Sequence, residues 1–201
     1  MLQQFVDEVN NSIEDRVRNM HTVIPGKIVE YDPGTGLATV EPVMKMRKPD
    51  GNMIPYPRIT GVPVMFCQTF GQNATVATPV KPDDGCLILV SEQSIDYWMY
   101  GHDTDTDLAF DITNAICIMG LFVPPNPIMQ IACEEEAIVL DLKGTRVRIK
   151  DGEIIIDAEH VQLNGRMDAT GDVTAETVSL AHHIHTGDSG GLTSPPHKGS
   201  A

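Results

Sequence analysis

The sequence predicts an all-β protein with one N-terminal helix, a small barrel and a β-helical stalk that forms only as an oligomer. Three observations predict this class. Most of the 201 residues show short apolar stretches of period two, separated by turn residues, as β-strands do. Only residues 2–20 show the apolar spacing of a helix. The last third of the chain contains strands too short to bury their apolar faces within a single copy.

Residues 1–22 are expected to form an amphipathic helix. A narrow apolar stripe recurs here every four residues, at Phe5, Val9, Ile13 and Val17. A stripe of this kind packs on another surface or on copies of itself. The dipeptide Pro25-Gly26 is expected to end the helix.

Residues 23–125 are expected to form the barrel. A first hairpin is predicted from residues 27–31 and 37–43, with a turn at Asp32-Pro33-Gly34 in which Gly34 takes a positive φ. Further strands are predicted at 58–63, 74–78 and 86–90. This spacing, with a single helix outside, is typical of a small barrel. A stiff connector then marks the boundary, with Pro124, Pro125 and Pro127.

Residues 126–180 are expected to form the stalk. Apolar residues alternate at 138–142, 147–149, 154–156, 161–163 and 178–180, and glycines separate these groups. One copy of such a ribbon leaves an apolar face uncovered and two strand edges unpaired. Wrapping identical copies around a shared axis removes both problems, so the ribbon predicts an intertwined oligomer.

Residues 181–201 are expected to form a metal-binding tip. Side chains alternate along an extended segment, so His183 and His185 lie on one side of it. Three chains around a threefold axis supply six imidazoles, an octahedral set that fits Fe(II), Co(II) or Ni(II) better than tetrahedral zinc. Availability favours iron, with one ion per trimer shared by six histidines. The inward register of Val178 and Leu180 continues to His182, so a bulge or turn near Ala181 is required.

Composition excludes several function classes. The net charge of −14 and the lack of a basic patch argue against nucleic acid as a partner and against docking on an anionic membrane surface. The cysteines form no CxxC pair and are expected to be buried free thiols. The N-terminus lacks a signal-peptide pattern, so synthesis in a reducing cytosol is expected. The alternating acids of residues 102–107 lack the glycine and glutamate of a calcium loop, and a solvated loop is expected.

Several segments resemble a known family. "GKIVEYDPGTGLATVEPV", "KPDDGCLILVSEQSIDYW" and "DITNAICIMGLF" resemble the OB-fold domain of the small central spike, or membrane-piercing, proteins of contractile phage tails and tailocins. The glycine-punctuated ribbon resembles their intertwined trimeric β-helix. "HIHTGDSGGLTSPP" resembles their tip, where two histidines from each of three chains bind one iron ion. The resemblance assigns that role here to His183 and His185 only.

The resemblance implies a structural homotrimer without enzymatic activity, located in the virion at the tip of the tail baseplate and made in the bacterial host cytoplasm. It implies that the OB-fold end seats on the baseplate hub protein and caps the tail tube. Sheath contraction would then drive the shaft through the host outer membrane. Two other functions fit the sequence less well. A metal-dependent hydrolase needs an open coordination position and a general base, but HExxH is absent and the nearest acid is Asp188. An OB-fold module that binds carbohydrate or oligonucleotide fits poorly with 5% aromatic residues.

Overall fold

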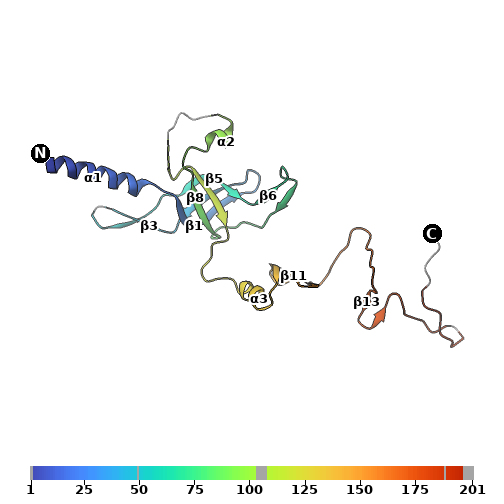
Figure 1. Ribbon diagram of the computed structural model, residues 1–201. Coiled ribbons are helices and arrows are strands. Elements are labelled where there is room, and N and C mark those ends of the chain that lie inside the picture. The colour runs from blue at the N-terminus through green and yellow to red at the C-terminus, as the bar shows by residue number, and fades with distance from the viewer. Residues whose placement is uncertain (1, 49, 103–107, 188, 197–201) are drawn as a thin grey trace. The chain divides into compact units, whose positions relative to one another are not determined.

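The computed structural model describes residues 2–48, 50–102, 108–187 and 189–196 (Figure 1). The chain divides into two compact units, Met1–Met129 and Gln130–Ala201. Residues 103–107, which belong to the expected solvated loop, lie outside the described residues. No helix in the described part of the chain is long and apolar enough to cross a membrane.

The first unit begins with the predicted helix, α1 (Leu2–Asn19). Its four stripe residues are between 41% and 63% exposed, so no described part of the chain covers them. Pro25 and Gly26 do not form the expected break, because they lie inside the first strand of the barrel. Gly26 is buried there, and a Cβ at this position would come within 2.5 Å of Ile88 Cδ1. Close packing explains this glycine.

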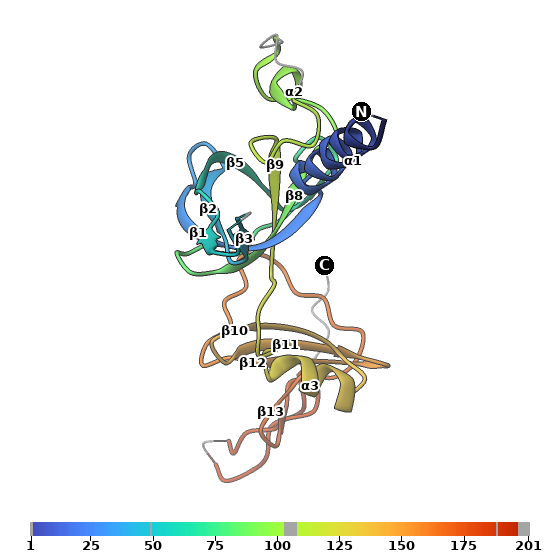
Figure 2. The same ribbon diagram turned by 90° about the vertical axis from the view of Figure 1, so that its left-hand side faces the viewer.

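Five strands form a closed barrel (Figure 2) in the order β1-β2-β5-β9-β8, with β1 paired to β8. Their bounds are β1 Val23–Asp32, β2 Leu37–Pro42, β5 Ile59–Met65, β8 Gly85–Val90 and β9 Ala115–Met119. All the pairings are antiparallel except that between β5 and β9, which is parallel. A small barrel was predicted, and this strand order fits the OB-fold that the resemblance implies. The strand expected at 74–78 was wrong as a barrel strand, because residues 74–76 pair in a separate hairpin, and β9 takes its place in the barrel.

The barrel encloses the hydrophobic core. Alternate residues of each strand point inward, which is the period-two pattern seen in the sequence. The core cluster consists of Ile28, Ala38, Val40, Ile59, Val62, Val64, Cys86, Ile88, Ala115 and Cys117. Cys86 and Cys117 are buried as expected, whereas Cys67 and Cys133 are exposed. The expectation of buried thiols was wrong for these two, because the short strand and helix that carry them lie outside the barrel.

The turn between β1 and β2 differs from the predicted one. Asp32 organises it, since its carboxylate accepts hydrogen bonds from the Gly34 amide at 2.8 Å and the Thr35 hydroxyl at 2.9 Å. These bonds hold the pKa of Asp32 below its usual value. The positive φ falls at Gly36, at 73°, and not at Gly34, because the turn is longer than predicted and closes with a bond from the Gly36 amide to the Asp32 carbonyl.

Three further elements extend from the barrel. Two are hairpins, and their strands are β3 (Lys45–Arg47) with β4 (Met53–Pro55), and β6 (Cys67–Thr69) with β7 (Ala74–Val76). The third is the short helix α2 (Asp96–Tyr100). Trp98 on this helix is 72% exposed and therefore takes no part in the core.

The second unit contains the predicted ribbon, of which one part forms strands. The helix α3 (Ile128–Glu134) spans the boundary between the two units, and just before it the side-chain oxygen of Asn126 accepts a hydrogen bond from the Ile128 amide at 3.0 Å. Three antiparallel strands follow, β10 (Ile138–Leu142), β11 (Thr145–Lys150) and β12 (Glu153–Asp157). A small hairpin comes later, formed by β13 (Thr174–Ala175) and β14 (Val178–Ser179).

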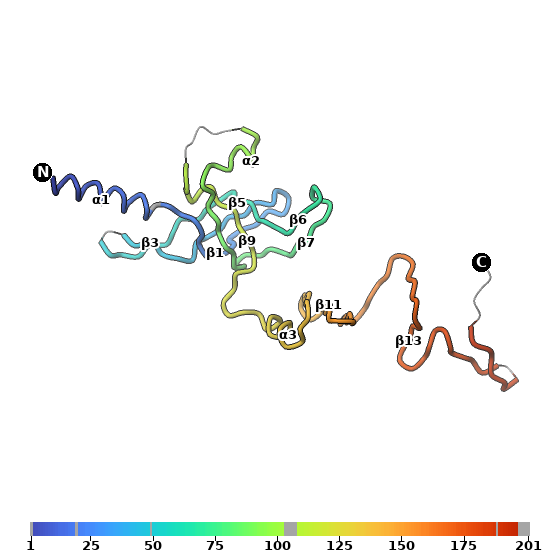
Figure 3. The backbone as a smooth tube through the Cα atoms, viewed as in Figure 1, coloured from blue at the N-terminus to red at the C-terminus, as the bar shows by residue number. Residues whose placement is uncertain are grey.

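The segment between β12 and β13 departs from the sequence prediction. Residues 158–173, all of them described, contain no helix or strand (Figure 3). The strand expected at 161–163 is absent because no other described segment of the chain pairs with it. The intertwined trimeric β-helix stays a prediction, since it depends on strand partners from other copies.

Candidate metal centre

The predicted metal ligands follow directly after the β13–β14 hairpin. The hairpin has a short register, with Thr174 opposite Ser179 and Ala175 opposite Val178. The Leu180 amide donates to the Val173 carbonyl at 2.8 Å, which extends the pairing by one residue. The strand register thus ends immediately before the histidines.

A turn at residues 180–182 then changes the chain direction. The His183 amide donates to the Ser179 carbonyl at 3.1 Å, and the His182 amide donates to the Ser179 hydroxyl at 2.8 Å. Asp172 Oδ1 accepts a hydrogen bond from the Ala181 amide at 3.1 Å. Hydrogen bonds from Ser179 and from Ala181 hold the pKa of Asp172 below its usual value. The turn that the metal hypothesis requires near Ala181 is therefore present.

The His183 imidazole is held in one tautomer. Its Nδ1 lies 2.7 Å from the Ser179 carbonyl oxygen and 3.1 Å from that of Leu180. Because a carbonyl oxygen only accepts hydrogen bonds, Nδ1 must carry the hydrogen. The lone pair is then on Nε2, as in histidine ligands that bind a metal through one nitrogen and donate the other to a backbone carbonyl. His183 fits the role of a metal ligand.

His185 lies beside His183 on a chain reversal. The two imidazole centroids are 5.1 Å apart, and the ring planes are nearly perpendicular at 88°. The His185 amide donates to the Thr193 hydroxyl at 2.8 Å, and the Thr193 amide donates to the His185 carbonyl at 2.8 Å. Thr186 and Leu192 pair in the same reversal. Both the amide and the carbonyl of His185 are thus held by Thr193.

One chain supplies only part of a coordination shell. Among the described residues, no three His, Cys, Asp or Glu side chains come together to hold a metal. Asp188, the nearest acid in the sequence, lies outside the described residues. Imidazole nitrogens suit first-row transition metals such as iron, nickel and zinc. The pair of histidines therefore fits part of the coordination shell of a transition metal.

The three-stranded sheet of the second unit carries an uncovered apolar face. Directly paired residues share a face, and Ile149 pairs with both Ile138 and Ile154. The apolar sheet face consists of Ile138, Leu140, Leu142, Val147, Ile149, Ile154 and Ile156. Apart from the half-buried Val147, these side chains are between 40% and 66% exposed. A continuous apolar surface of this kind marks an interaction site.

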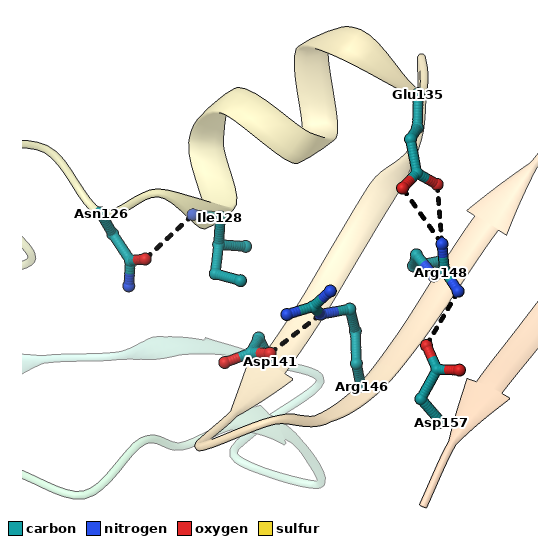
Figure 4. A network of polar contacts seen from close by, with 7 residues as sticks. All are labelled: Asn126, Ile128, Glu135, Asp141, Arg146, Arg148 and Asp157. Carbon is teal, nitrogen blue, oxygen red and sulfur yellow. Dashed lines mark hydrogen bonds and ion pairs between the residues drawn. The ribbon is translucent and has the colours of Figure 1, made fainter.

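The opposite face of the same sheet carries ion pairs (Figure 4). Arg148 lies between two carboxylates, at 2.9 Å from Glu135 and 2.9 Å from Asp157, and Lys150 also contacts Glu135. The hydrogen bonds from Lys150 and Arg148 hold the pKa of Glu135 below its usual value. Arg146 pairs with Asp141 at 2.9 Å. Sequence reasoning missed these pairs, although the alternate basic residues of "RVRIK" were the available signal. The sheet is thus apolar on one face, whereas the other face carries these ion pairs together with Val139 and Ile155.

A comparison with protein families identifies the barrel. Residues 24–120 match the family model described as the phage protein Gp138 N-terminal domain. The matched range covers all five barrel strands except the first residue of β1. No curated protein matches the chain. The family match supports a structural role in a phage particle, and hence an association with the virion.

Proposed function

We propose that this chain is the central spike of a contractile phage tail, a homotrimer that caps the tail tube and pierces the host outer membrane when the sheath contracts. One observation carries the proposal. A barrel matched by a phage-protein domain is followed in the same chain by a sheet whose apolar face is uncovered. The barrel would seat on the baseplate hub, and the following unit would form the shaft.

The apolar sheet face supports the trimer. Three copies placed around an axis would bury these side chains against one another and leave the charged face outward, toward solvent. In that arrangement strand edges pair between copies, so a shaft under load has no free edge from which to unzip. This function needs a stiff body and no chemical step.

The histidines support a metal clamp at the tip. His183 and His185 from three chains would supply six nitrogens to one iron ion, filling an octahedral shell. A full shell has no position for a substrate, so the metal would be structural. It would join the three chains where strand pairing ends.

The metal content of the purified trimer tests the proposal. We expect a trimer in sedimentation velocity and one iron ion per three chains by elemental analysis. The double variant His183→Ala/His185→Ala should lose the metal and remain trimeric, because the apolar sheet face is unchanged. His160→Ala, outside the tip, serves as the matched control and should keep the metal. A stable monomer would refute the spike, and one metal per chain would favour the hydrolase.

A further inference from the structure

A cleft with a volume of about 700 Å³ lies between the end of α1 and the β3–β4 hairpin. Both elements project from the same side of the barrel (Figures 1 and 2). Asp15, Arg18 and His21 line it from the helix side. The hairpin and the segment after it line the other side, with Met46, Arg47, Lys48, Gly51, Ile54 and Tyr56. The cleft lies within the first unit.

The charge of this cleft opposes that of the whole protein. Three cationic side chains and one carboxylate line it, whereas the chain carries a net charge of −14. Arg47 and Lys48 form no ion pair within the described part of the chain. Two other cations of the barrel region, Lys27 and Arg58, instead both pair with Glu41. The cleft therefore holds two cationic side chains, Arg47 and Lys48, that no acid among the described residues neutralises.

The cleft also has an apolar wall. Met46 and Ile54 lie directly opposite each other in the hairpin. Tyr56 meets His21 edge to face across the cleft, with ring centroids 5.6 Å apart. Arginine and tyrosine are enriched in the centres of protein interfaces. A phosphate or a nucleic-acid backbone would use the cations but not the apolar wall. An acidic protein segment with apolar side chains matches both.

We propose that this cleft docks an acidic, amphipathic segment of the baseplate hub protein. The inference rests on the proposed function, which attaches the barrel end to the hub. The inference adds which residues recognise the hub protein and which kind of hub segment they recognise. Unpaired exposed cations steer an acidic partner and fix its register, and the apolar wall then buries the partner's side chains. The net charge led to the expectation that the chain lacks a basic patch. This expectation was wrong at the cleft, because the acidic residues elsewhere in the chain outweigh the basic residues of "KMRK" at residues 45–48.

Charge reversal at the cleft tests the inference on the full-length trimer. The test variant is Arg47→Glu/Lys48→Glu. The matched control is Lys81→Glu/Lys143→Glu, which changes the net charge equally at two exposed lysines that also lack an ion pair among the described residues. Binding to the purified hub protein of the same phage is measured by interferometry. Binding is measured at an ionic strength of about 0.01 M and again at about 0.15 M. The Debye length is about 30 Å at the first ionic strength and about 8 Å at the second.

We expect wild-type binding to weaken with salt, the cleft variant to bind roughly tenfold or more weakly, and the control to bind as the wild type does. Unchanged binding by the cleft variant would overturn the inference and leave attachment to the hub intact. Equal weakening of both variants would assign the effect to bulk charge and overturn it also. If the cleft variant changes its oligomeric state, the cleft is a contact with a second copy of the chain and the inference is overturned. If a short DNA duplex displaces the hub, the cleft binds nucleic acid and the inference is overturned as well. Failure of the wild type to bind the hub would overturn the proposed attachment together with this inference.

Discussion

The substitution Ile154→Asp on β12 should convert the proposed trimer into monomers. Ile154 is 66% exposed in the single chain and pairs with Ile149 across the apolar sheet face. Complete burial of an isoleucine side chain stabilises by about 1.5–3 kcal/mol, so burial of the remaining two thirds gives roughly 1–2 kcal/mol per chain. Three chains together contribute about 3–6 kcal/mol. The aspartate removes this contribution and also brings three carboxylates into an apolar contact, which adds several kcal/mol.

A loss of about 6 kcal/mol or more lowers the association constant by roughly four orders of magnitude. Sedimentation velocity at micromolar concentration measures the result directly. Val76→Asp is the matched control, because Val76 on β7 is 65% exposed and also β-branched but lies outside the apolar sheet face. We expect the control to remain trimeric. A trimer of Ile154→Asp with wild-type stability would refute the assignment of this face to the trimer contact.

Three further predictions concern the barrel core, the packing around one glycine and the acid dependence of the tip. Ile28→Ala should lower the free energy of unfolding of the barrel by about 2–5 kcal/mol in denaturant titration, because this side chain is fully buried. Gly85→Ala should destabilise the barrel by about 1–3 kcal/mol or more, since a Cβ there would overlap the backbone carbonyl of Leu121. Gly171→Ala meets no atom within 4 Å and should leave the thermal midpoint unchanged. The Asp172 carboxyl, whose pKa is held below its ordinary 3.8, should stabilise the turn above that pH and lose this effect as the pH falls through its lower folded value. Hydrogen exchange at the turn amides should therefore rise on acidification in the wild type, and Asp172→Asn should abolish that rise.

The barrel was largely predictable because its strands alternate buried and exposed residues in a short, regular pattern. In β2, for example, Ala38 and Val40 are buried and their neighbours are not. The β3–β4 hairpin was missed because its strands are only three residues long and expose nearly every side chain. Gly36 was also missed, since the Asp32 side chain selects a longer turn than Pro33-Gly34 suggests.

The tip was predictable in its residues but not in its geometry. The spacing of His183 and His185 identified a candidate ligand pair, and the register argument required a turn near Ala181. The tautomer of His183 could not be predicted, because it depends on where the carbonyl oxygens of Ser179 and Leu180 lie.

The ribbon between β12 and β13 was overpredicted for a different reason. Period-two alternation identifies a segment that can pair, but it does not say that the partner lies in the same chain.

The chain reversal at residues 185–193 has a mechanical consequence. Thr193 and His185 exchange two hydrogen bonds across the reversal, so the apex between them is a loop with two arms. A compressive force on such an apex is shared by the two arms, whereas a single extended strand would carry the whole force and would buckle. In a trimer, six arms would share the thrust, and the histidines would lie at the base of this loop, where the arms are joined.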